Sequence, residues 1–190
     1  MGKIDQYWKS NFEQMAPVGW DLRIKLAPRW VRFHGLPGGK RYPENDKERS
    51  IVAERANTLA HAVLGDAGPY YVYAYVYEPD PDLPFSVDAS WRYHGIPLDQ
   101  RFTCLEDGEP DAARIVVFTG AAQDLGGSFD AAVLGIAEDL SARSIWVSPT
   151  TGNVFAPYDG GFDLILSDPG AISALKKAHK KWLSKREDGL

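Results

Sequence analysis

The chain has 190 residues, of which 44% are hydrophobic and 25% are charged, a composition typical of a globular protein with a hydrophobic core. Its formal net charge of −5 disfavours a general nucleic-acid-binding protein, because a surface that meets nucleic acid should be basic. The single cysteine, Cys104, excludes an intramolecular disulfide and a cysteine-rich zinc site.

The N-terminal region is predicted to form a helix and then a strand. Apolar side chains at near-helical spacing indicate a short amphipathic helix over residues 3–14, which Pro17 and Gly19 end. Alternating side chains over residues 29–34 indicate a strand. Glycines and prolines follow this strand directly and predict a sharp turn.

The clearest helix is predicted over residues 45–64. Asn45 is able to cap its first turn, Glu48 occupies the position of a capping box, and Gly65 is a natural stop. An apolar stripe on this helix should face the core, and it consists of Val52, Ala56, Leu59 and Val63.

The next predicted strand, over residues 69–78, carries a row of tyrosines on one face: Tyr71, Tyr73, Tyr75 and Tyr77. Such a face is typical of a surface that a helix half covers, with the hydroxyl groups at its wet edge. Tyrosines also stack on nucleic-acid bases, but no basic groove accompanies this row.

The rest of the chain is predicted to hold short strands and two helices. The strands are expected over residues 87–94, 115–118, 144–148, 153–155 and 162–166. The first helix is expected over residues 128–140, and its inward-facing side chains are Phe129, Val133, Ile136 and Leu140. The second helix should begin with Asp168 as its cap and Pro169 as its first residue.

These elements together predict an α+β fold, because strands outnumber helices and the two do not alternate strictly. We expect a single domain over residues 1–190. Its sheet should be mixed or antiparallel with about five to seven strands, and three main helices should accompany a short N-terminal helix.

The most distinctive feature of the sequence is a repeated segment. The run RFHGLP at residues 32–37 is followed by Arg41, and the run RYHGIP at residues 92–97 is followed at the same distance by Arg101. On a strand, the arginine and the histidine of each copy point to the same side. Arginine matches phosphate and carboxylate geometry, and histidine exchanges a proton near neutral pH, so the segment is a candidate binding site.

Two interpretations of the repeat remain open. If the two strands are neighbours, Arg32, His34, Arg92 and His94 could converge on one anion, with the two histidines as catalytic groups. Two-histidine phosphoesterases, however, carry a hydroxyl residue two positions after each histidine, where this chain has leucine or isoleucine. The other interpretation is a repeated strand-and-turn unit whose arginines and histidines pair with nearby carboxylates.

A second candidate site lies in the run YDGGFD at residues 158–163. Asp159 and Asp163 flank a glycine pair and could bind a cation or act as acid and base. A hard cation requires more oxygen ligands than two, so no metal site is predicted. The candidate binding residues of the whole chain are therefore Arg32, Arg41, Arg92, Arg101, Asp159 and Asp163.

Four stretches of the chain carry a family resemblance. They are WVRF at residues 30–33, ERA at 54–56, NVFAPYDGGFDLI at 153–165 and HKKWL at 179–183. Together they resemble a little-characterised bacterial family of unknown function. The resemblance implies that the fold is shared with that family, and it supplies no catalytic residues.

The leading functional hypothesis is a non-catalytic protein that binds another protein in the bacterial cytoplasm. It rests on the negative charge, the missing catalytic constellation, the many aromatic side chains and the acidic stretches at residues 78–82 and 106–111. Its most specific form is an immunity-type inhibitor that occludes a toxin, and steering by charge favours a basic toxin. No cofactor, nucleic acid or membrane is expected to bind.

A cytoplasmic location is expected because residues 1–13 lack the apolar core of a secretion signal and no run approaches the length of a membrane span. The alternative function is an enzyme or sensor for a small anionic ligand, either a phosphate ester or a nucleotide. That alternative requires the paired arginine and histidine segments to meet within a few ångströms in one cleft.

Overall fold

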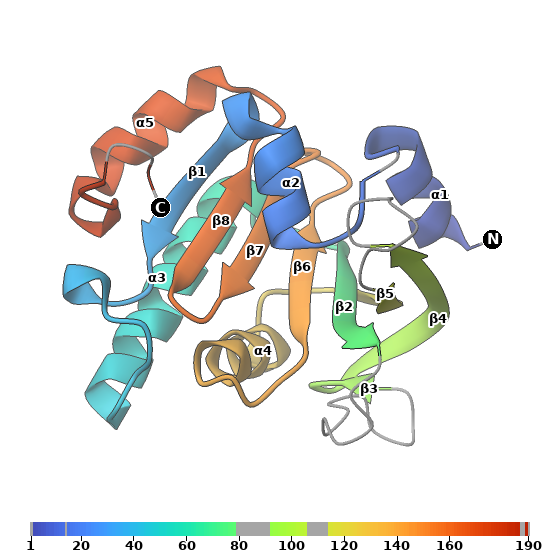
Figure 1. Cartoon of the computed structure of the whole chain (residues 1–190), viewed down its shortest axis with the longest axis horizontal. Helices are drawn as coiled ribbons and strands as arrows, with labels where there is room; N and C mark the ends of the chain where they lie inside the picture. The colour runs from blue at the N-terminus through green and yellow to red at the C-terminus, as the bar shows by residue number, and fades with distance from the viewer. Residues whose placement is uncertain (1, 14, 79–91, 106–113, 187–188, 190) are drawn as a thin grey trace.

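The computed structural model describes residues 2–13, 15–78, 92–105, 114–186 and 189. Within these ranges eight strands form one sheet in the order β1-β8-β7-β6-β2-β5-β4-β3 (Figure 1), and all of the paired strands are antiparallel. The strands are β1 (Trp30–His34), β2 (Tyr70–Glu78), β3 (Arg92–Tyr93), β4 (Ile96–Leu105), β5 (Arg114–Ala122), β6 (Arg143–Val147), β7 (Val154–Tyr158) and β8 (Gly161–Ile165).

Helices cover both faces of this sheet. The α-helices are α1 (Lys3–Asn11), α2 (Gly19–Lys25), α3 (Asp46–Leu64), α4 (Gly127–Ala137) and α5 (Gly170–Ala178), and the short 3₁₀ helices are η1 (Ala27–Arg29), η2 (Pro37–Gly39) and η3 (Lys180–Trp182). Helices α1 and α2 lie on one face, and α3 and α4 lie on the other (Figure 1). Within the described ranges, none of these helices combines the length and the apolar character that a membrane crossing requires.

The alternation of side chains along β2 divides the interior into two cores. Val72 and Ala74 pack toward α3 and α4, whereas Tyr71, Tyr73 and Tyr75 are buried beneath α1 and α2. The hydroxyl group of Tyr73 donates to the backbone carbonyl of Ile4 at 3.0 Å. Helices cover the tyrosine row as expected, but they bury Tyr71, Tyr73 and Tyr75 almost completely, and the Tyr73 hydroxyl does not lie at the expected wet edge.

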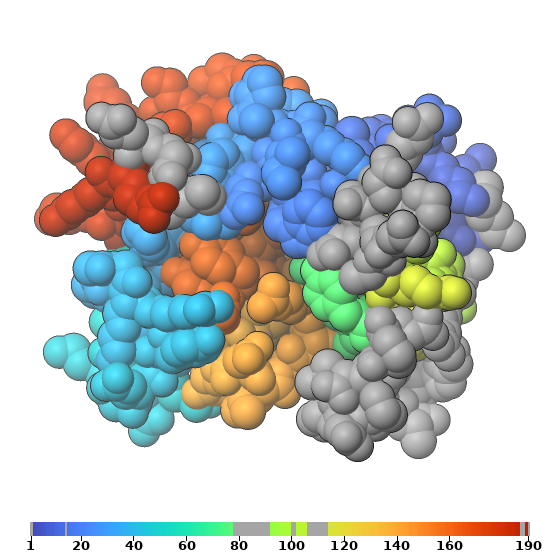
Figure 2. Space-filling model, in the orientation of Figure 1, coloured from blue at the N-terminus to red at the C-terminus, as the bar shows by residue number. Residues whose placement is uncertain are grey.

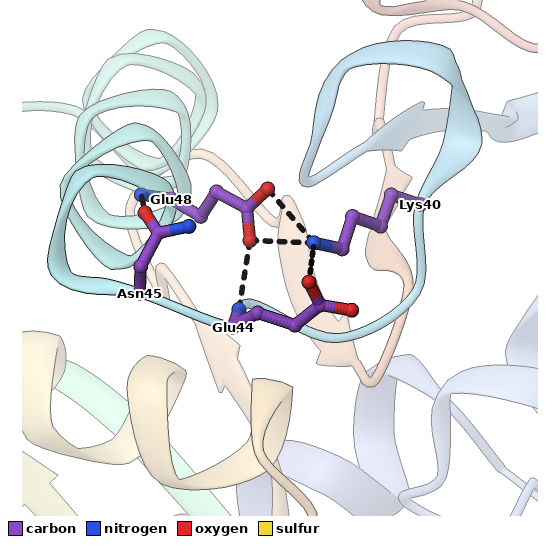
Figure 3. A network of polar contacts seen from close by, with 4 residues as sticks. All are labelled: Lys40, Glu44, Asn45 and Glu48. Carbon is purple, nitrogen blue, oxygen red and sulfur yellow. Dashed lines mark hydrogen bonds and ion pairs between the residues drawn. The ribbon is translucent and has the colours of Figure 1, made fainter.

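Helix α3 begins where the capping signal places it. The side chain of Asn45 accepts a hydrogen bond from the backbone N–H of Glu48 at 3.1 Å. The carboxylate of Glu48 accepts from the backbone N–H of Glu44 at 2.7 Å, one residue before the cap, and from the ammonium group of Lys40 (Figure 3). Gly65 ends the helix with a φ of 86°, a value that glycine adopts without strain.

The fold class is α+β with an antiparallel sheet, but the expected number of elements was only roughly right. Helix α2 was not predicted, because Pro17 and Gly19 were interpreted as the end of helical structure. Strand β5 extends to nine residues, beyond the apolar run at 115–118. The helix expected over residues 128–140 ends at Ala137, so Leu140 lies in the following turn and is exposed, contrary to the prediction.

The second copy of the repeated segment forms a hairpin. Strand β3 contains only its first two residues, and His94 and Gly95 then adopt φ values of 47° and 87° in a turn that leads into β4. The strand expected over residues 87–94 is thus confirmed only at β3, because residues 79–91 lie outside the described ranges.

Candidate functional site

The two copies of the repeated segment lie at opposite edges of the sheet. Strand β1, which contains Arg32 and His34, is the first strand of the order, whereas β3, which contains Arg92 and begins the hairpin of His94, is the last. The expectation that these four side chains converge in one cleft is therefore wrong. Sequence similarity between two strands does not determine their partners: β1 pairs with β8, and β3 pairs with β4.

The second copy makes local contacts at its own edge. Arg92 donates through Nη1 to the carbonyl of Gly95 at 2.8 Å, and Nε2 of His94 lies 2.7 Å from the hydroxyl oxygen of Ser141. Arg101 is paired with Phe118 in β4, and its side chain lies outside the described structure. The strand and turn agree with the other interpretation of the repeat, but the two contacts of Arg92 and His94 are to a backbone carbonyl and a serine hydroxyl and not to the expected carboxylates.

The first copy borders a cleft of about 410 Å³ on the face of the sheet that carries α2. Figure 2 shows a hollow near the centre of this face, with β7 and β8 in orange at its floor, α2 in blue above and β2 in green beside it. The charged and polar side chains that line the cleft are Arg23, Arg32, His34, Arg41, Arg143, Tyr158, Asp159 and Asp163. Trp20 and Tyr75 add aromatic walls.

The cleft forms where two strands diverge. Strand β6 pairs with β7 only at Trp146 and Val147, although β7 continues to Tyr158. Pro157, which has no N–H to donate, stands in the part of β7 that has no partner on the β6 side. The opening of the sheet at this point exposes side chains of β6, β7 and β8 to one hollow.

Arg32 and Asp163 form the most buried ion pair of the cleft. They are cross-strand partners in β1 and β8, and Arg32 donates through Nε and Nη2 to the two carboxylate oxygens at 2.8 and 2.7 Å. Trp30 donates its indole N–H to the same carboxylate at 2.7 Å. Burial lowers the pKa of Arg32, but the hydrogen bonds and the charge of Asp163 outweigh it, so the pKa is raised overall. The ring of Tyr158 stacks on this guanidinium at 4.3 Å.

Arg41 and Asp159 form a second pair at the rim. Asp159 lies in the turn between β7 and β8 and accepts from Nε of Arg41 at 2.7 Å and from the hydroxyl group of Tyr42 at 3.1 Å. The following glycine pair is not a flexible loop, since Gly161 belongs to β8. A side chain at Gly161 would collide with the backbone oxygen of Phe33, so the turn is packed tightly against β1.

Two further arginines reach the cleft, and sequence analysis missed both. Arg23 lies on α2, 5.9 Å from the ring of Trp30, and Arg143 begins β6 opposite Tyr75. Neither makes an ion pair with any residue that the structure describes. Four arginines and two aspartates therefore give the cleft a formal charge of +2 in a chain whose net charge is −5.

His34 lines the cleft beside these arginines. Its pKa is lowered by burial and by the positive charges of Arg32 and Arg55. Arg55, from α3, also donates to the backbone carbonyl of His34 at 2.9 Å and so holds the end of the edge strand in place.

The carboxylates of the cleft are engaged with arginines and not arranged around a cation. Asp159 and Asp163, the two residues considered for cation binding, each accept from an arginine. No group of three or more histidine, cysteine, aspartate or glutamate side chains in the described part of the chain could hold a metal ion. The excess of arginine over carboxylate in the cleft is chemically suited to an anionic group.

Comparison with protein families gives one match. The family model described as a domain of unknown function, DUF3885, matches residues 18–187. The chain belongs to this family. The resemblance inferred from the sequence is thereby confirmed, and the DUF3885 match includes every residue that lines the cleft, whereas α1 precedes it. Comparisons with curated proteins and with solved structures find no match.

Proposed function

We propose that the protein binds a small anion, with phosphate as the preferred group, in the cleft between α2, β1 and the β7–β8 turn. The observation that carries this proposal is the pair Arg23 and Arg143, two cations that line the cleft without a carboxylate partner in the described structure. Guanidinium groups form paired hydrogen bonds to phosphate and carboxylate, so these two side chains are suited to hold such a ligand.

The surrounding residues support binding by keeping the site preorganised. Asp163 and Asp159 fix the guanidinium groups of Arg32 and Arg41 without cancelling the positive charge of the cleft. The volume of about 410 Å³ falls within the range of small-molecule sites. Trp20 and Tyr158 provide aromatic surface beside the charged groups, as such sites commonly do.

The proposal is one of binding and not of turnover. His34 is able to accept a proton, but the second histidine of the expected pair lies at the other edge of the sheet. The small-anion alternative is therefore retained with a different set of residues, drawn from α2, β1, β6 and the β7–β8 turn.

Calorimetric titration with inorganic phosphate at low ionic strength tests this proposal. The wild type should bind saturably, and Arg23→Ala or Arg143→Ala should each weaken the affinity by roughly tenfold or more, because each removes a charge-assisted contact. Arg92→Ala, at the opposite edge of the sheet, is the matched control and should bind as the wild type does. Equal affinity in all four proteins would contradict the proposal.

Binding to another protein is a second candidate function. The acidic stretches on which it first rested, residues 78–82 and 106–111, fall almost wholly outside the described residues. What favours it now is that Ile24 on α2 and Tyr42 beside Arg41 are exposed hydrophobic side chains. Immunity against a basic toxin remains its most specific form. Pull-down from the native host with the wild type and with Ile24→Asp tests it, since a true partner should be recovered only by the wild type.

A further inference from the structure

A second hollow adjoins the proposed anion site. It has a volume of about 330 Å³ and shares Tyr75 and Arg143 with the first cleft. Most of its lining surface is apolar, and the other residues that line it are Val76, Tyr77, Asp139, Leu140, Ser141 and Ala142. The two hollows therefore meet at one arginine and one buried tyrosine.

Leu140 is the most exposed large hydrophobic side chain in the described structure, with 77% of its surface accessible. Its backbone is held in place, because its N–H donates to the carbonyl of Gly135 at 2.8 Å and the preceding residue, Asp139, adopts a left-handed φ of 58°. The core does not account for a leucine presented to solvent at the mouth of a hollow.

The aromatic wall of this second hollow is also fixed. Tyr77 accepts a hydrogen bond from the indole N–H of Trp20 at 3.1 Å, and its ring meets that of Tyr75 edge to face with 6.4 Å between centroids. Trp20 lines the anion cleft, so this hydrogen bond joins a wall of the first hollow to a wall of the second. A ligand that enters both would meet a preformed surface.

From the two lining residues that the hollows share, Tyr75 and Arg143, we infer that the ligand is an amphiphilic phosphate ester, an inference that rests on the proposed anion-binding function. Its phosphate group lies among the arginines of the first cleft, and its aromatic or aliphatic group passes Arg143 and covers Leu140. Charge selects the first group, and burial of apolar surface selects the second. The ester linkage then lies near the junction formed by Arg143 and Tyr75.

Calorimetric titration with inorganic phosphate and with 1-naphthyl phosphate separates the two hollows. The naphthyl ester should bind the wild type at least about tenfold more tightly than phosphate, because the ring is removed from water. Leu140→Gln should abolish that gain and leave the affinity for phosphate unchanged. Ile24→Gln is the matched control, since Ile24 is 62% exposed on α2 and lines neither hollow, and it should keep the gain.

The outcomes of this experiment are distinct. Equal affinity for the two compounds, with phosphate still bound, would overturn the amphiphilic ligand and leave the anion site standing. A gain that survives in Leu140→Gln would also overturn it. Binding of neither compound to the wild type would overturn both the anion site and the inference built on it.

Discussion

The ion pair of Arg32 and Asp163 lines the cleft and also stabilises the fold. Their side chains are 11% and 5% exposed, and the carboxylate accepts three hydrogen bonds from two side chains of β1. Removal of one partner of a buried pair leaves the other charge without compensation, which is far more harmful than the loss of a pair on the surface. Because the pair spans β1 and β8, its loss should loosen the wall of the cleft.

Asp163→Ala should therefore lower the free energy of unfolding by about 3–5 kcal/mol in a urea titration. The control is Glu44→Ala, which removes one carboxylate of the exposed network around Lys40 (Figure 3). This variant should change the free energy of unfolding by less than about 1 kcal/mol. If both variants lost a similar amount of unfolding free energy, the buried Arg32–Asp163 pair would contribute no more to stability than an exposed pair does.

The imidazole of His34 should titrate below the ordinary histidine pKa of about 6.5, because burial and two arginines disfavour its charged form. The folded state favours the neutral form of His34, so the contribution of this side chain to the free energy of unfolding is fully present above pH 6.5. That contribution is lost as the pH falls through the folded-state pKa. A pH series of NMR spectra measures the midpoint directly. Phosphate in the cleft should raise that midpoint, and a midpoint above 6.5 without phosphate would contradict the described environment.

At the residue scale, sequence patterns found only part of the site. Arg32, Arg41, Asp159 and Asp163 were selected because they stand in motifs, and the structure brings them together in one cleft. Arg23 and Arg143 stand in no motif and reach the cleft through the packing of α2 and the divergence of β6, which no local pattern specifies. The periodicity of α2 is too short to signal a helix on its own.

Among the helices, the local signals at the two ends of α3 were reliable, whereas α5 begins one residue later than expected, at Gly170 with Pro169 as its cap. The cap at Asn45 and the stop at Gly65 were read from single residues, and both hold. Helix α2 is stabilised by a local side-chain contact: the carboxylate of Asp21 accepts from the backbone N–H of Ala16 at 2.8 Å, which holds the preceding segment against the helix. The i,i+4 ion pair of Asp21 with Lys25 was the available signal for this helix.

Replacement of the cap of α3 gives a measurable consequence. Asn45→Ala should lower the free energy of unfolding by about 1 kcal/mol, because the N–H of Glu48 loses its acceptor. Asn45→Gly is the comparison variant. It should lower the free energy of unfolding by only a few tenths of a kcal/mol, because glycine is itself tolerated at the N-cap position. Chemical denaturation of both variants decides the point, and equal losses would count against a capping role.

At the scale of the whole molecule, the sheet order determines which residues meet. The repeat suggested two equivalent strands, but β1 and β3 end on opposite edges, so only one copy reaches the cleft. Strand order depends on long-range pairing, and the described sheet joins β1 to a strand more than a hundred residues away in sequence. Local sequence patterns were enough to predict the fold class. The composition of the cleft could not be predicted from them, because it depends on the strand order of the sheet.

A crystal soaked in tungstate, an electron-dense analogue of phosphate, would show whether the cleft holds an anion. We expect an anomalous-scattering peak in the cleft, within hydrogen-bonding distance of Arg23 and Arg143. The exposed lysines of α5, Lys176 and Lys177, provide an internal comparison for unspecific attraction of anions. Peaks at those lysines with none in the cleft would contradict the account.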